Sequence, residues 1–443
     1  MSHKANTHLK GERGQAFTDQ IRNVPPERIL CVSLDIGKYF HVVMMHNALG
    51  EIVTPTFEVD IFQAGFTKLC AAIDDAAARC RAKVVLTGME PTGHYFENLA
   101  RHLRARPQPV TLINSYAVKQ NRSQQMMRRE KTDEIDVAAV GDLLRRGEGT
   151  LYRPASGLYL QLQHLDRVRI AKLKMQTMLK NQILGHLDRI FPGLVLQGQE
   201  AIDRYPPLFT TSFWYCQTLQ HLVRLCPDPG RLVALSPSEL VALFHEQHYR
   251  LGQINATKII AYAQKTLLPE AELSAIRSDL LQADLTLLEH LQLQIDHLEQ
   301  RLGDLLAQVP AAAWAKLKGL STVQVASLVA AMGDPAHYTS AAQIFRRAGL
   351  VSGRNDSGRR QRKGKGQGVL KVGDVYLRRA VMMATETLIL HQPVLRQYYT
   401  TLKKTKHPGV ARVATARKAL GILWATLRDQ RSTTLLLKKG PAM

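Results

Sequence analysis

The segment 29–45 constrains the fold more than any other part of the chain. It is apolar and rich in β-forming residues, yet Asp35 stands in its middle, followed by Ile36 and Gly37. A carboxylate that is buried in an apolar strand is costly unless something compensates its charge. The segment therefore predicts strands, one of which delivers an acid to a place with a special electrostatic role.

The elements that follow indicate one fold class. With 51–59, the first segment makes three strands joined by short connections. We expect a helix at 61–81, a strand at 83–89, a helix at 94–105, a strand at 110–113 and a helix from Thr132. Three antiparallel strands and then alternating helices and strands are the ribonuclease-H-like order. The sequence thus predicts an α/β domain over 28–150, preceded by a polar, disordered leader over 1–27.

The second part of the chain reads as helical. A long helix is expected over 157–187, an irregular helical insert broken by prolines over 190–275, and a mostly helical domain over 311–443. Between them, two sets of apolar residues recur every seven positions. These are Leu281, Leu288, Ile295, Leu302 and Val309, with Leu291, Leu298 and Leu305. The segment 151–310 is therefore expected to hold a coiled coil, either as a helix pair within one chain or as a seam for self-association.

Charge points to a polyanionic partner. The net charge is +22, and the stretch 345–443 holds 22 Lys and Arg against four acids, which leaves +18 there. Such a one-sign excess is typical of nucleic-acid binding. No apolar run nears the roughly 18 residues of a membrane span, and the N-terminus has no secretory signal. Five cysteines without CxxC spacing indicate reduced thiols, so we expect a cytoplasmic protein.

Four acids form a candidate metal site. Glu90 closes the strand 83–89, which the expected order places beside the strand of Asp35. Asp133 and Asp136 are three residues apart at a helix start, so they point the same way. Acids at one end of a sheet repel one another unless a divalent cation neutralises them, and oxygen-only ligands suit Mg²⁺ or Mn²⁺. Alternatively, Asp133 and Asp136 cap the helix and favour its positive end.

A serine in the basic stretch is a candidate nucleophile. Ser357 stands between Asp356 and Gly358, and arginines and lysines follow it. A hydroxyl in positive surroundings can attack a phosphodiester and hold a DNA end covalently. The local residues alone favour an ordinary Ser-Gly turn with arginines that only bind phosphate.

These residues together resemble one family, the DEDD-type insertion-sequence transposases, whose members include bridge-RNA-guided recombinases. The matching blocks are 34–38, 89–95, 131–136, 348–350 with 356–358, and 371–379, in the family's order and approximate spacing. Val137 stands where the family usually has alanine, and no proline follows Leu350 closely; neither change removes a catalytic group.

The resemblance implies a RuvC-like domain in which Asp35, Glu90, Asp133 and Asp136 bind magnesium, and a transposase domain in which Ser357 is the nucleophile. It implies donor and target DNA and a structured guide RNA as partners, and sites composed across the subunits of a dimer or tetramer. The expected nucleic-acid contacts are Arg354, Arg359, Arg360, Arg362, Lys363, Lys365, Lys371, Arg378 and Arg379.

Two rival functions remain. In a metal-dependent nuclease or Holliday-junction resolvase, water would attack and Ser357 would be a turn residue. A non-catalytic packaging protein would explain the basic stretch and the helical arm, but it gives no reason for Asp35 inside a strand.

Overall fold

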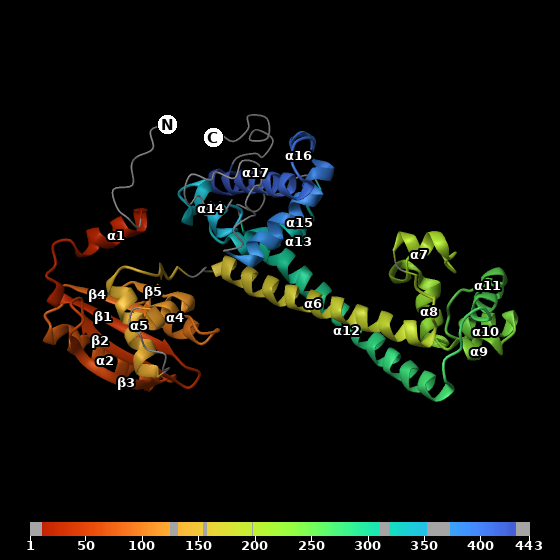
Figure 1. Cartoon of the computed structure of the whole chain (residues 1–443), viewed down its shortest axis with the longest axis horizontal. Coiled ribbons are helices and arrows are strands. Elements are labelled where there is room, and N and C mark those ends of the chain that lie inside the picture. The colour runs from red at the N-terminus through yellow and green to blue at the C-terminus, as the bar shows by residue number, and fades with distance from the viewer. Residues whose placement is uncertain are drawn as a thin grey trace. The chain divides into compact units, whose positions relative to one another are not determined.

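The computed structural model describes residues 11–124, 132–153, 157–196, 198–309, 319–351 and 373–430, and the chain divides into two compact units, 1–154 and 155–443 (Figure 1). We expected boundaries at 150 and 310. The second does not separate compact units, because helices before and after residue 310 share one core. All five cysteines are free thiols. Among the described helices, none has the length and apolar content that crossing a membrane requires.

The first unit is a mixed α/β domain around one six-stranded sheet. Its strands are β1 (Ile29–Ile36), β2 (Phe40–Asn47), β3 (Ile52–Asp60), β4 (Val84–Met89), β5 (Val110–Leu112) and β6 (Thr150–Leu151). Its helices are α1 (Gly11–Ile21), η1 (Pro26–Arg28), α2 (Gln63–Arg79), α3 (Phe96–Leu103), α4 (Ser115–Gln124) and α5 (Asp133–Arg145). The strand order is β3-β2-β1-β4-β5-β6. β1, β2 and β3 are antiparallel neighbours, whereas β4 runs parallel to both β1 and β5.

Helices cover both faces of the sheet, which explains why β1 is apolar throughout. On one face, Leu30, Val32 and Leu34 pack in a core with α2 and α3. On the other face, Cys31 packs with Leu144 of α5. Alternate residues of β1 therefore point to opposite helical layers.

The N-terminal leader is more ordered than we expected. Residues 11–21 form α1, and Phe17, Ile21 and Val24 pack against a small core around Ile29. The prediction of a disordered leader over 1–27 was therefore wrong for this part. Phe17 and Ile21 are four residues apart, so they lie on one face of α1. Their packing against this core holds the helix on the domain although the rest of the segment is polar.

The second unit is helical. It contains α6 (Gly157–Ile190), α7 (Gln199–Arg204), η2 (Phe213–Tyr215), α8 (Gln217–Leu225), α9 (Pro229–Val233), α10 (Pro237–Glu246), α11 (Gln253–Ala263) and α12 (Ala271–Ala307). It continues with α13 (Thr322–Met332), η4 (Pro335–His337), α14 (Ala341–Arg347), α15 (Val375–His391), α16 (Pro393–Lys403) and α17 (Pro408–Asp429).

Helices α6 and α12 form an antiparallel pair within the chain. Arg169 bonds to Glu299 at 2.7 Å, and further along Gln176 bonds to Gln292 at 2.5 Å. The heptad residues are buried or half-buried, and those toward the two ends of α12, such as Leu281 and Leu302, join cores to which α6 contributes. The intrachain alternative for the heptad is thus observed, and self-association would use other residues.

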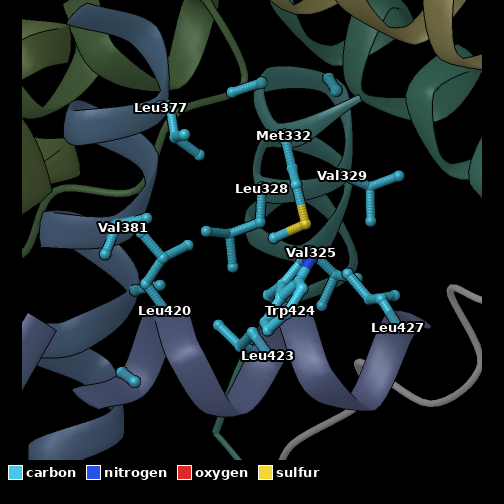
Figure 2. Packing of buried hydrophobic residues seen from close by; sticks show 14 of the residues in the cluster. Val325, Leu328, Val329, Met332, Leu377, Val381, Leu420, Leu423, Trp424 and Leu427 are labelled. Atoms are coloured by element: carbon cyan, nitrogen blue, oxygen red, sulfur yellow. The ribbon is translucent and has the colours of Figure 1, made fainter. Parts of the chain in front are cut away.

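Each end of this helix pair carries a core. The insert helices α8–α11 pack with the end that holds Ile183 and Leu281. Helices α13, α15 and α17 pack with the end that holds Leu162 and Leu302, and Figure 2 shows side chains of these three helices pointing toward one another. The buried Trp424 there donates its indole N–H to the carbonyl of Pro335 at 3.1 Å.

Candidate functional site

Two predicted acids lie side by side at one end of the sheet. Leu34 of β1 is in register with Met89 of β4, and the ladder reaches one residue further, since the amide of Glu90 lies 3.4 Å from the carbonyl oxygen of Leu34. Asp35 and Glu90 are therefore neighbours across two adjacent parallel strands, at the same end of the sheet. Their backbones are about 5 Å apart. Both are half-buried.

The turns that follow these acids explain why glycine stands at positions 37 and 93 in the blocks 34–38 and 89–95. At Gly37, a Cβ atom would lie 2.3 Å from the carbonyl oxygen of Phe40, so only glycine fits the turn between β1 and β2. Gly93 has φ +53° in the turn between β4 and α3. Each acid is thus followed by a tight turn that fixes where its strand ends.

Helix α5 brings the other two acids to this end. Val42 stands opposite Asp35 in the sheet, and it packs against Val137 of α5. At the other end of the helix, Leu144 packs against Cys31. The helix therefore runs along the face of Asp35 with its first turn, which contains Asp133 and Asp136, toward that residue.

The start of α5 is built as a capped helix end. Thr132 is the N-cap, and its hydroxyl oxygen accepts from the amide of Ile135 at 3.3 Å. Asp133 is exposed, whereas Asp136 is buried with a relative exposure of 6%. Acids in the first turn also favour the positive end of the helix dipole, so these residues stabilise the helix whatever else they do.

Close approach of α5 to the sheet depends on Gly141. A Cβ atom there would lie 2.3 Å from Nε2 of His46 and 2.7 Å from Oγ of Ser33. These two buried groups are 3.4 Å apart, and Nδ1 of His46 lies 2.8 Å from the carbonyl oxygen of Asn47. If Nδ1 donates to that oxygen, Nε2 accepts from the Ser33 hydroxyl. Burial lowers the pKa of His46.

Sequence reasoning missed one residue of the site, Arg122 on α4. Its guanidinium forms an ion pair with Asp136, and the two side chains are only 15% and 8% exposed. A buried carboxylate needs a partner, and Arg122 supplies it here. The signal lay in the basic segment before Thr132, but the helix 115–124 was not expected.

The structure does not bring the four acids together as a finished ligand set. Within the described ranges, no group of three or more His, Cys, Asp or Glu side chains is close enough to hold a metal ion. The chemistry of the donors nevertheless fits magnesium, because all four are carboxylates. Arg122 meanwhile provides the positive charge that Asp136 requires.

The predicted serine and most predicted phosphate contacts lie outside the described residues. These are Ser357 with Arg354, Arg359, Arg360, Arg362, Lys363, Lys365 and Lys371. The described residues before and after the segment 352–372 are close together. The amide of Asp374 donates to the carbonyl of Arg347 at 2.6 Å, and a Cβ at Gly373 would lie 2.8 Å from the amide nitrogen of Gly349. The described residues on either side of the segment 352–372 therefore meet at one place on the helical core.

The two described arginines of that set have internal contacts. Arg378 donates to the carbonyl oxygen of Ala348 at 3.2 Å. Arg379 lies near Asp166, whose pKa is raised by burial against the lowering effects of Ser327, Arg169 and Arg379. Both arginines are half-buried, so each has a structural role besides any phosphate contact.

Gly319 has a packing role. In the structure Gly319 has φ +101°, and a Cβ atom there would lie 2.5 Å from Cβ of His391 on α15. The glycine is therefore required by a helix that packs against it.

Comparisons with known proteins match both units. A family model described as a transposase, DEDD_Tnp_IS110, matches residues 32–192. A second model, described as the transposase IS116/IS110/IS902 family, matches residues 312–400. No curated protein gives a significant match. The first match begins in β1 and contains all four acids, and the second contains the basic segment with Ser357.

Proposed function

The chain belongs to the IS110-type DEDD transposases, and from this premise we propose that it is an RNA-guided recombinase that cuts and rejoins DNA through a serine-linked intermediate. The observation that supports the proposal is the arrangement of the first unit: Asp35 and Glu90 lie side by side on β1 and after β4, and α5, whose first turn holds Asp133 and Asp136, packs on the face of Asp35. DNA transposase activity itself follows from the family.

A RuvC-like identity of the first unit is supported by its topology. Three antiparallel strands come first, and β4 and β5 then add in parallel on the other side of β1. This is the ribonuclease-H-like order expected from the sequence. Folds of that order have the first strand at the centre, which places Asp35 in the middle of the sheet end.

We assign the metal to the same end. Asp35, Glu90, Asp133 and Asp136 would hold Mg²⁺, or Mn²⁺ in its place. When bound, the cation would offset the charge on the phosphate in transfer. The ion pair with Arg122 balances the charge of the buried Asp136. This acid of α5 therefore keeps its place at the sheet without a second positive group.

The serine step conserves the energy of the DNA bond. The hydroxyl oxygen of Ser357 forms a bond to the scissile phosphorus, and the phosphorus–oxygen bond to one sugar breaks. The leaving sugar oxygen takes up a proton and becomes a hydroxyl. Rejoining is the same exchange with a new hydroxyl attacking the serine-linked phosphate. Arginines of the segment 352–372 would neutralise the transferring phosphate.

RNA guidance fits the distribution of charge. The stretch 345–443 carries +18, which gives broad affinity for phosphates without reading bases. Base pairing with a structured RNA would then choose the DNA site.

Self-association as a dimer or tetramer is supported by an exposed apolar stripe. Leu273, Leu280 and Leu287 of α12 are seven residues apart and 41%, 51% and 56% exposed, so they do not face α6. A second copy would cover them.

Trapping tests the serine step. Full-length protein is mixed with Mg²⁺, guide RNA and end-labelled DNA, and is then denatured and resolved on a gel. Wild-type protein is expected to carry label, and Ser357→Ala to carry none while it still binds DNA and RNA. Ser352→Ala is the matched control, because Ser352 is also followed by glycine in the same basic segment.

The nuclease alternative predicts a different result. If water attacks, DNA is cut but no label stays on the denatured wild-type protein. Equal labelling of wild type and Ser357→Ala would also defeat the assignment of Ser357.

A further inference from the structure

A cavity of about 480 Å³ opens in the first unit, on the face of the sheet that α2 and α3 cover. It lies between the turn after β1, the end of β3, the N-terminal part of α2 and the helix α3 with the turn before it. The side chains that give it its chemistry are His41, Phe62, Phe66, His94, Tyr95 and His102. The four-acid site does not use any of them.

His41 brings an unused polar atom to this cavity. It stands opposite Ile36 in the sheet and has a relative exposure of 4%. Its Nδ1 atom is buried without a hydrogen-bond partner in the described part of the chain. Buried polar atoms are nearly always paired, so an orphaned one beside a cavity indicates a ligand with a complementary polar edge.

Aromatic rings surround the same space. Phe66 and His102 meet edge to face with centroids 5.4 Å apart, and His94 lies 4.4 Å from Tyr95. Phe62 is 71% exposed although it lines the cavity, so its ring is open to a flat partner. Proteins hold an unstacked nucleobase by stacking aromatic side chains on its faces and by hydrogen bonds to its polar edge. The aromatic rings and the histidine of this cavity offer both.

A cation, two amides and one carboxylate, that of Asp60, also line the cavity. Nζ of Lys38 lies 4.9 Å from the ring centroid of Tyr39, and that ring is 66% exposed. Gln63 and Asn98 also line the cavity and offer donors and acceptors. The site therefore combines stacking surfaces, base-edge partners and a positive charge for the attached phosphate.

The cavity is connected to the acidic end by two short stretches of chain. Lys38 comes three residues after Asp35, and His94 comes four residues after Glu90. Stretches of this length span at most about 10–14 Å. A strand whose phosphate lies at the acids can therefore reach around the sheet end into the cavity.

We propose that this cavity receives one unstacked nucleobase of the strand held at the acidic end, with Tyr39 and Phe62 as stacking surfaces and His41 as base-edge partner. The inference rests on the proposed nucleic-acid function. It assigns to the loop after Glu90 a second task besides ending β4, namely to place His94 and Tyr95 beside the base. The base can belong to DNA or to guide RNA, since the chemistry is shared.

Photo-crosslinking tests the proposal without requiring catalysis. Full-length Ser357→Ala protein is irradiated with single-stranded DNA or RNA that carries 5-iodouracil at one position at a time, and the modified peptides are identified by mass spectrometry. We expect adducts on Tyr39, Phe62 or Tyr95 from one or two positions of the strand. The arm that gives them, DNA or RNA, identifies the source of the base.

Two variants make the result specific. Phe62→Ala, at an exposed position that tolerates truncation, should lower the yield of these adducts about fivefold or more, as loss of one stacking surface predicts. Tyr215→Ala is the control, because Tyr215 is 83% exposed and lies in the other unit; its yield should equal that of the parent.

The outcomes separate this inference from the serine mechanism. Cavity adducts, together with a wild-type protein that carries no label in the trapping assay, support the base pocket and defeat only the serine step. Adducts confined to other peptides, while the strand is bound, overturn the base pocket. So does an unchanged yield in Phe62→Ala together with a change in oligomeric mass, which would make this face an interface between copies.

Discussion

Gly141→Ala tests whether the acids of α5 depend on close contact between this helix and the sheet. Alanine in a helix is normally better than glycine by about 1 kcal/mol, so intrinsic propensity alone predicts stabilisation. At this position the new Cβ would lie 2.3 Å from Nε2 of His46 and 2.7 Å from Oγ of Ser33. Both are buried and stand on neighbouring strands, so neither can swing away.

The size of the effect follows from these distances. Ordinary contact needs about 3.5 Å, so α5 must move outward by about 1 Å. Overpacking of this kind costs about 1–3 kcal/mol, and contact with two buried atoms points to the upper end. After the gain in helix propensity, a net loss of about 2 kcal/mol remains. The same shift moves the first turn of α5 away from Asp35, so recombination should also fall although no carboxylate is removed.

Hydrogen exchange measures this locally in the full-length protein. A loss of about 2 kcal/mol corresponds to roughly thirtyfold faster exchange in peptides that cover α5. Gly185→Ala is the matched control in α6, because the nearest atom to its new Cβ is Nη1 of the flexible Arg189 at 3.4 Å. That variant should exchange as slowly as wild type or more slowly. If Gly141→Ala behaves like Gly185→Ala, close packing of α5 is not what positions the acids.

Two further predictions concern the same unit. Arg122→Ala leaves Asp136 buried without its partner and should lower the free energy of unfolding by about 3 kcal/mol; Mg²⁺ should restore part of the loss in a thermal melt, and an equal melting temperature for variant and wild type would contradict the role of the pair. Burial lowers the pKa of His46 below its ordinary value of 6.5. Below pH 6.5 the unfolded chain binds a proton at His46, whereas the folded chain leaves this imidazole neutral until the pH reaches the lowered pKa. The contribution to stability is thus complete above pH 6.5 and is lost as the pH falls toward the lowered pKa. His46→Gln should therefore show a flatter decline in unfolding free energy between pH 7.5 and 5, and an identical decline would refute the assignment.

The sheet could be predicted well because its strands carry strong local signals. β1 to β4 are β-branched or apolar runs bounded by turns, and the observed bounds lie within a few residues of those expected. Asp35 and Glu90 could be placed at one end of the sheet because the expected strand order puts the strand of Asp35 beside the strand that Glu90 closes. Helix α4 was missed because its sequence is polar, with helix formers that give no apolar period.

What the sequence could not provide were contacts between distant residues. Arg122 pairs with an acid fourteen positions later, and no local pattern links them. The heptad of α12 showed an apolar stripe, but its partner could have been α6 or a second copy, since both would bury the same leucines. The glycines at 141 and 319 are explained by His46 and His391, which lie far from them in the chain.

The most direct test of the metal assignment is the binding of Mn²⁺ to the full-length protein, followed by electron paramagnetic resonance. Wild-type protein should bind the ion. Asp35→Asn and Glu90→Gln should each weaken the affinity for Mn²⁺ tenfold or more, because each removes a carboxylate that coordinates the ion directly. Asp142→Asn should bind like wild type, because Asp142 lies on the same helix but is engaged by Asn121, Arg145 and Arg146. Undiminished Mn²⁺ affinity in both Asp35→Asn and Glu90→Gln would show that this end of the sheet does not hold the cation.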